Sequence, residues 1–141
     1  MKVCLDTNVL ISAFATRGLC ADVVRLVLAG HELVVAEVVL EEVQRVLKKK
    51  FDLPQQTVRE IVAFLKEHTV QPAPKVTTAP HVRDLDDQWV LESALAAKAD
   101  VLVTGDKDLL DVKSKVSGLV ITDPRGFWDM LRKQTKEEKD V

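Results

Sequence analysis

The chain opens with Lys2-Val3-Cys4-Leu5-Asp6-Thr7-Asn8, a short apolar run that stops at three polar residues. Such a run, apolar and partly β-branched, indicates a buried strand. Asp, Thr and Asn favour turns and helix starts, so the strand should end at Leu5 and a helix should follow from about Val9. This unit of buried strand, polar turn and helix decides the fold class, because related units follow it along the chain.

Further strands and helices are predicted by the same criteria. Apolar runs at 33–35, 101–103 and 119–121 indicate buried strands, and apolar residues at helical spacing predict helices over about 21–28, 37–50, 56–67 and 84–99. Pro124 should open a last helix, and the proline-rich stretch 71–80 should form a loop. Short strands that alternate with helices indicate an α/β fold with a parallel sheet covered on both faces. We expect one domain over residues 1–132 and a disordered charged tail over residues 133–141.

Composition narrows the class of protein. With 141 residues, 47% of them hydrophobic and 30% charged, the chain should fold as one globular domain. No apolar run approaches the roughly 20 residues that span a bilayer, and no small-residue cleavage site follows Met1-Lys2. The two cysteines form neither a metal-ligand spacing nor a disulfide framework. We therefore expect a cytoplasmic protein without membrane contact.

The net charge of −2 and the pI near 5.9 argue against a broadly polycationic nucleic-acid binder, whose pI is usually above about 9. They leave a nuclease open, because an acidic metal site offsets basic charge elsewhere in the chain.

Two acidic residues follow predicted strands. Asp6 follows the first strand directly, and Asp106 comes after the strand at 101–103, behind Thr104 and Gly105. In open α/β sheets, functional groups gather at the carboxyl ends of strands. Each residue taken alone is also well explained as a helix cap.

Helical geometry singles out Glu42. At about 100° per residue, Glu42 lies beside the apolar stripe that contains Val39 and Val43, whereas Glu41 points nearly the opposite way. Glu42 is thus placed to reach inward, although an ordinary flanking position explains it equally well.

The same geometry singles out Asp87. Val90, Leu91 and Ala94 follow it by three, four and seven residues, which places Asp87 on the buried face of a helix. A carboxylate there needs compensation, because an unpaired buried charge is costly. Asp84 is better explained as a helix cap and Asp86 as an exposed partner of the helix dipole. A helix that began later would put Asp84 or Asp86 in the place of Asp87.

Several carboxylates at one edge of a sheet repel one another and raise each other's pKa values. A hard cation relieves this repulsion, and a ligand set of oxygens without histidine or cysteine suits Mg²⁺ or Mn²⁺. Such ions polarise phosphoryl oxygens and activate water for attack. The residues thus suggest phosphodiester hydrolysis.

Four segments resemble, in order, the acidic motifs of the PIN-domain family: Val3–Ser12, Leu40–Leu47, Asp84–Ala97 and Val103–Leu110. The resemblance covers nearly the whole chain, about residues 1–128. Within the family, the chain is most similar to the VapC-like ribonucleases, the toxin components of prokaryotic toxin–antitoxin systems. The first and last motifs are the specific ones.

The resemblance implies a three-layer α/β/α sandwich with a central, mainly parallel sheet of four to five strands. It implies a metal-dependent endoribonuclease that cuts single-stranded RNA, pairs with a small antitoxin and forms a homodimer. Carried over to this sequence, the catalytic metal ligands for Mg²⁺ or Mn²⁺ would be Asp6, Glu42, Asp87 and Asp106. Asn8 and Thr104 would orient a carboxylate or water, and Asp108 would do the same or act as an additional ligand.

Some residues outside the acidic set have two interpretations. Lys107, beside Asp106, is a candidate phosphate contact, and Lys48–Lys50 with Arg45 would either contact RNA or form a solvated helix end. Trp89 would either stack on a base or serve packing or a dimer surface. Trp89 and Glu92 depart from the family pattern in the third motif.

Two other functions compete with the nuclease. A non-catalytic PIN-like module that binds RNA or protein is the main alternative, and the presence of all four motif acids weakens it. A phosphatase or phospho-acceptor domain built around Asp6 is disfavoured, because haloacid-dehalogenase-like phosphatases need a second Asp where this chain has Asn8. Receiver domains typically place an acidic pair before the strand-one region, and Lys2–Leu5 offers none.

Overall fold

Five parallel strands form the centre of the protein in the computed structural model, which describes residues 1–139. The sheet order is β3-β2-β1-β4-β5, and every neighbouring pair is parallel. The strands are β1 (Lys2–Leu5), β2 (Glu32–Ala36), β3 (Thr69–Gln71), β4 (Val101–Val103) and β5 (Val120–Thr122).

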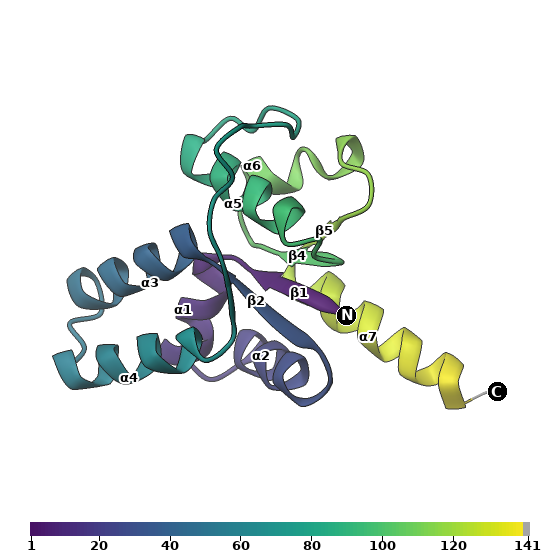
Figure 1. Ribbon diagram of the computed structural model, residues 1–141. Coiled ribbons are helices and arrows are strands. Elements are labelled where there is room, and N and C mark those ends of the chain that lie inside the picture. Colours follow the sequence, from purple (N-terminus) through teal and green to yellow (C-terminus); the bar gives the residue numbers. More distant parts are fainter. Residues whose placement is uncertain (140–141) are drawn as a thin grey trace.

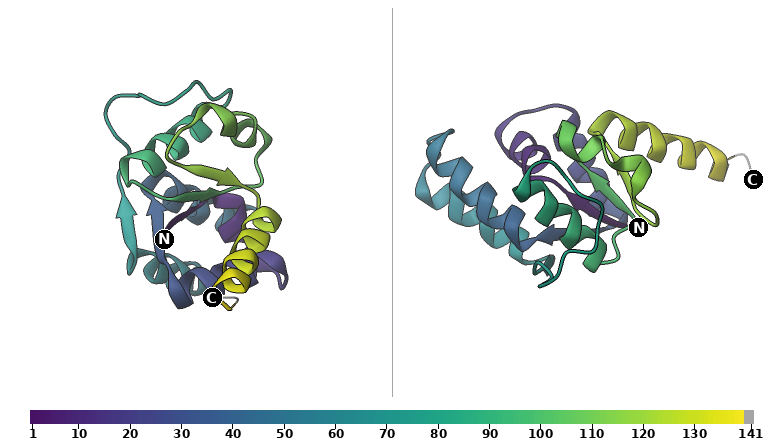
Figure 2. Two further views of the ribbon diagram at one scale, coloured as in Figure 1. Left: turned by 90° about the vertical axis from the view of Figure 1, so that its right-hand side faces the viewer. Right: turned by 90° about the horizontal axis from the view of Figure 1, so that it is seen from above.

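Helices cover both faces of this sheet. Helices α5 (Leu85–Ala96) and α6 (Lys107–Leu110) lie on one side of it in Figure 1, and α1 (Thr7–Ala15), α2 (Leu19–Gly30) and α4 (Gln55–Lys66) lie on the other. Helix α3 (Glu37–Lys49) packs against α4, and α7 (Pro124–Lys139) packs against α2. Seen from above in Figure 2, α3 and α4 lie at one end of the molecule and α7 extends from the other. The predicted α/β/α sandwich is confirmed.

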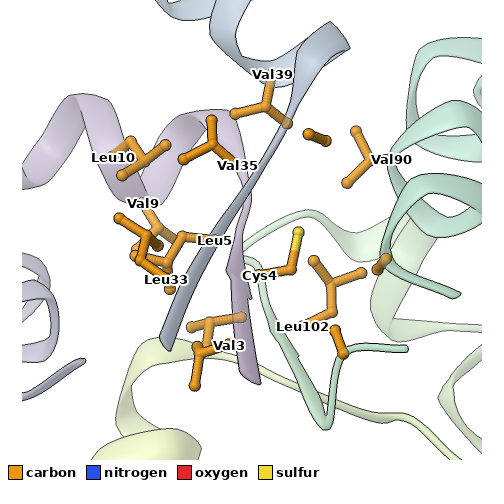
Figure 3. Close-up of a cluster of buried hydrophobic side chains, with 14 of the residues drawn as sticks. Val3, Cys4, Leu5, Val9, Leu10, Leu33, Val35, Val39, Val90 and Leu102 are labelled. Carbon is orange, nitrogen blue, oxygen red and sulfur yellow. The ribbon is translucent and has the colours of Figure 1, made fainter. Parts of the chain in front are cut away.

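The core is apolar on both faces of the central strand. Figure 3 shows Leu5 of β1 on the side of Val9 and Leu10 of α1, whereas Cys4 lies on the opposite side, towards Val90 of α5. This alternation follows from the two-residue period of a strand. Because both faces are covered, β1 reads as a continuous apolar run, and Val3, Cys4 and Leu5 are all fully buried.

The strand order reverses between β1 and β4. From β1 the chain moves outward through β2 to β3, then returns to add β4 and β5 on the other side of β1. Ligands of open α/β sheets bind at the carboxyl ends of the strands where the order reverses. The residues after Leu5 and after Val103 stand at this point, because these two paired residues end their strands.

Some local elements differ from the predicted ones. Residues 69–71 form the edge strand β3, which includes the first residue of the predicted loop, and a short helix, α6, follows Asp106. The charged segment from residue 133, expected to be disordered, continues α7 as far as Lys139, and residues 140–141 lie outside the described residues. No helix within residues 1–139 combines the length and apolar character needed to cross a membrane.

Candidate metal centre

Asp6 is held rigidly at the end of β1. It is only 4% exposed and caps α1, with the Thr7 amide donating to Oδ1 at 2.8 Å. The Thr104 hydroxyl donates to Oδ2 at 2.7 Å. Burial raises the pKa of Asp6 and the charge of Asp106 adds to the shift, while the two hydrogen bonds oppose it. Both oxygens are therefore oriented by groups that favour the ionised form.

Thr104 links the ends of β1 and β4. Its hydroxyl, fully buried, donates to Asp6 and accepts the Asp106 amide at 3.0 Å. Asp106 in turn caps α6, where its Oδ1 accepts the Asp108 amide at 2.9 Å. Asp6, Thr104 and Asp106 thus form one connected polar chain at the reversal of the strand order.

Three carboxylates converge beside this chain. One carboxylate oxygen from each of Asp87, Asp106 and Asp108 lies within 4.8 Å of the other two, and all three residues are half-buried. Asp87 comes from the first turn of α5, and the other two come from the start of α6. Helices from two parts of the chain therefore bring like charges together at one edge of the sheet.

The electrostatics of Asp87 reflect this crowding. Burial raises its pKa to about 8, and Asp106 contributes through its charge and as a hydrogen-bond partner. Asp6 and Asp84 raise the pKa further. Like charges this close cannot all ionise cheaply, so the group takes up either a proton or a cation near neutral pH.

Glu42 faces the same centre from α3. It is half-buried, and burial raises its pKa, with the charge of Asp6 next in importance. The Thr7 hydroxyl lowers that pKa, although Thr7 Oγ1 is buried without a hydrogen-bond partner of good geometry among the described residues. Glu42 and Asp6 are therefore electrostatically coupled, while Glu42 lies outside the tight group of three.

This donor set fits a hard divalent cation. The converging groups are all carboxylates, and no histidine or cysteine from the described part of the chain joins them. Oxygen-only sites suit Mg²⁺, Ca²⁺ or Mn²⁺. The pKa values of Asp6, Glu42 and Asp87 are all raised, so a cation bound among these groups would relieve their repulsion and lower all three values.

Residues 2–108 match the family model of the PIN domain. The chain belongs to the PIN-domain family. The solved structures with a similar fold include two VapBC complexes. One is VapBC2 from Rickettsia felis bound to a DNA fragment from their promoter, with a TM-score of 0.61, 14% identity, and coverage of 87% of this chain and 98% of that one.

The other is VapBC-1 from nontypeable Haemophilus influenzae, with a TM-score of 0.59, 21% identity, and coverage of 89% and 99%. No curated protein matches the chain significantly.

The structure distinguishes Asp84, Asp86 and Asp87, the three acids among which the sequence left the choice of ligand open. Asp84 is exposed, caps α5, and accepts the amides of Asp86 and Asp87 at 2.9 and 3.2 Å. Asp86 is exposed, and only Asp87 joins the group of three carboxylates. The cap at Asp84 fixes the helix start, which is what turns Asp87 towards Asp106.

Asn8 and Thr7 both follow Asp6 at the start of α1 and differ in burial. Asn8 is exposed, and its side chain makes no hydrogen bond to the acidic residues within the described chain. Thr7 is buried beside Glu42 and was not predicted as a site residue. The signal lay in the helix start: α1 begins at Thr7, so Thr7 faces inward and Asn8 outward.

The basic residues predicted to contact RNA are Lys107 and the cluster on α3. Lys107 is exposed and makes no salt bridge in the part of the chain that the structure describes. Arg45 lines a pocket beside Glu42, whereas Lys48–Lys50 are exposed at the far end of α3. Lys107 therefore adjoins Asp106 in the sequence, and Arg45 is the cation whose charge lowers the pKa of Glu42.

Glu92, which departs from the family pattern, has a structural partner that the sequence did not reveal. Its carboxylate is 2% exposed and accepts the amides of Thr78 and Ala79 at 3.0 and 2.8 Å. It also accepts the Gln88 side-chain amide at 3.2 Å. Glu92 thus ties the proline-rich loop to α5, the helix that carries Asp87.

Proposed function

We propose that this PIN domain is a metal-dependent endoribonuclease that hydrolyses phosphodiester bonds of single-stranded RNA. The observation that carries the proposal is the convergence of Asp87, Asp106 and Asp108 beside the buried carboxylate of Asp6. Membership of the PIN-domain family supports the same reaction class.

Asp6, Glu42, Asp87 and Asp106 would hold Mg²⁺ or Mn²⁺, with Asp108 as an additional ligand or as a group that orients one. When bound, the ion supplies Lewis acidity for attack on the phosphodiester. The chain's own contribution is orientation: Thr104 fixes Asp6, and the caps at Asp84 and Asp106 fix the helix starts that carry the other acids. Asn8, exposed beside Asp6, would orient a carboxylate or water.

Lys107 would contact the RNA backbone. Its ammonium is exposed next to Asp106, so it can approach a phosphate without breaking an ion pair. Such a contact raises affinity for RNA without reading sequence.

We further propose that the protein is the toxin of a toxin–antitoxin pair, with a small antitoxin as its partner and a homodimer as its own assembly. The similarity in fold to VapBC2 and VapBC-1 supports the antitoxin. An antitoxin that covers the acidic edge would keep RNA from it.

Cleavage of a fluorescent single-stranded RNA by the purified protein tests the activity. The reactions contain Mn²⁺, Mg²⁺ or EDTA, and they compare the wild-type protein with Asp6→Asn and with Asp129→Asn, an exposed carboxylate on α7. We expect cleavage only with metal, loss of cleavage in Asp6→Asn with native circular dichroism, and wild-type rates in Asp129→Asn. Undiminished cleavage by folded Asp6→Asn would overturn the assignment. A well-folded wild-type protein that binds RNA without cutting any strand would favour the non-catalytic module.

A further inference from the structure

A small pocket adjoins the acidic centre between α3 and α5. Its volume is about 120 Å³, and it is lined by Val38, Glu41, Glu42 and Arg45 from α3 and by Asp86 and Trp89 from α5. Glu42 belongs both to this pocket and to the proposed metal centre, so the pocket lies directly beside that centre.

The size of the pocket limits its ligand to one small ring. A cavity of roughly 150 Å³ is known to hold benzene, so a pocket of about 120 Å³ with an open mouth is on the scale of one six-membered ring. Trp89 is half-buried, with part of its side chain exposed at the pocket. Bases of single-stranded RNA stack on exposed aromatic rings of this kind.

The charges of the pocket limit the ligand further. Besides Glu42, which the proposed metal centre uses, two carboxylates, those of Glu41 and Asp86, line the pocket together with a single guanidinium, that of Arg45. A phosphate is excluded by this balance, whereas a neutral ring that carries an amino group donates hydrogen bonds to the carboxylates. Carboxylates accept from the exocyclic amino group of cytosine. Arg45 then remains to donate to the ring carbonyl of the same base.

We propose that this pocket, which we call the Trp89 pocket, is a nucleobase subsite that holds a cytosine of the RNA beside the scissile bond. The inference rests on the proposed ribonuclease function and adds its base preference. Uracil has the same ring, but a carbonyl replaces the amino group and would meet the carboxylates of the pocket. The Trp89 pocket therefore discriminates between the two pyrimidines by the exocyclic amino group that only cytosine carries, whereas uracil offers the carboxylates the single N–H of its ring.

Binding and cleavage test the subsite separately. For binding, the Trp128→Phe variant leaves Trp89 as the single tryptophan, and its fluorescence is followed during titration with 2′-O-methyl RNA tetramers that resist cleavage. We expect a tetramer with one cytosine to quench Trp89 and to bind more tightly than the all-uracil tetramer. The Trp89→Ala variant, measured by anisotropy of labelled tetramers, should lose roughly 5- to 150-fold in affinity for the cytosine tetramer and most of the preference. Equal binding of both tetramers by the intact pocket would overturn the proposal, whether or not the protein cleaves RNA.

For cleavage, we map the cut sites in a long RNA that contains every dinucleotide. The wild-type protein should cut next to cytosine, and Trp89→Ala and Asp86→Ala should cut with a weaker base preference while keeping metal dependence. Metal-dependent cleavage with no preference for cytosine, or with a preference that survives in Trp89→Ala, would contradict the subsite and leave the ribonuclease intact. Absence of cleavage together with cytosine-selective quenching would contradict the ribonuclease and leave the subsite intact.

Discussion

The Thr104 hydroxyl donates to Asp6 Oδ2 at 2.7 Å and joins two residues that are 98 positions apart in the sequence. The Thr104 hydroxyl oxygen also accepts a hydrogen bond from the Asp106 amide, so a single buried side chain orients both strand-end acids. Partners of metal ligands set the orientation and basicity of those ligands. Thr104 therefore determines how precisely the ends of β1 and β4 present their carboxylates.

Replacement of this hydroxyl should impair both stability and activity. In Thr104→Val the volume is nearly kept, but Asp6 and the Asp106 amide lose a buried partner. We expect a loss of about 1–3 kcal/mol in the free energy of unfolding and a loss of about 10- to 100-fold in metal affinity or cleavage rate. Urea unfolding and RNA cleavage measure the two effects. Thr104→Ser keeps the hydroxyl and should retain most of both; equal defects in the two variants would contradict the role of the hydrogen bond.

The stability of the metal-free protein should fall as the pH rises. Asp87 has a pKa of about 8 in the folded chain and an ordinary value of 3.8, so the folded state holds this proton more tightly than the unfolded state. Its stabilising contribution is complete below the ordinary value and is lost as the pH rises through about 8. Asp6 and Glu42, whose pKa values are also raised by burial, act in the same direction.

The Asp87→Asn variant isolates this effect. Because asparagine does not titrate, the variant should be more stable than the wild-type protein at pH 8 and should show a flatter dependence on pH. Urea unfolding in EDTA between pH 5 and pH 9 measures this, with Asp129→Asn as the control. A wild-type protein whose stability rises over this range would contradict the crowding of carboxylates.

Lys107 should contribute affinity without base selectivity. In Lys107→Ala, binding of single-stranded RNA should weaken equally for all sequences, and the dependence of log affinity on log salt should become shallower by about 0.7 for each phosphate that is no longer neutralised. Anisotropy of a labelled RNA over a range of salt concentrations measures both quantities. Lys133→Ala, an exposed lysine on α7, provides the control. A salt dependence of Lys107→Ala equal to that of the wild-type protein would show that Lys107 does not contact the RNA phosphates.

Glu92 should stabilise the fold through the proline-rich loop. Its buried carboxylate accepts from two loop amides and from Gln88 through Oε1, and Oε2 accepts the Thr78 amide as well. A glutamine in its place removes the charge that strengthens these bonds and turns a donating NH2 group towards the Thr78 amide. We expect Glu92→Gln to lose about 1–3 kcal/mol in the free energy of unfolding. Glu67→Gln, at an exposed position, should change it little. Thermal unfolding of the two variants side by side measures the difference. Equal stability of Glu92→Gln and Glu67→Gln would show that other contacts hold the loop.

The buried strands were predictable from the sequence because their apolar runs are short and sharply bounded. β1 stops at Asp6 and β4 stops at Thr104, so the acids that follow them could be placed at one edge of the sheet. The edge strand β3 was not predicted, since Thr69-Val70-Gln71 contains one apolar residue and pairs with β2 alone.

The acids on helices were harder to place, because their orientation depends on where each helix begins. The sequence favoured Asp87 but left Asp84 and Asp86 as alternatives, and the cap that Asp84 provides fixes the helix start on which this choice depends. The closeness of Asp108 to Asp87 depends on α6, which has four residues and leaves no periodic signal. Glu92 was beyond prediction for another reason: its partners are backbone amides of a distant loop, and amides carry no sequence signature.

Calorimetric titration of Mn²⁺ into the metal-free protein tests most directly the claim that these carboxylates form a divalent metal centre. Wild-type protein and Asp129→Asn should bind the ion with equal affinity, and binding should release protons because Asp87 holds one near neutral pH. Asp106→Asn, with native circular dichroism, should lose most of that affinity. Binding of Mn²⁺ to Asp106→Asn as tightly as to the wild-type protein, or no binding to the wild-type protein at all, would contradict the account.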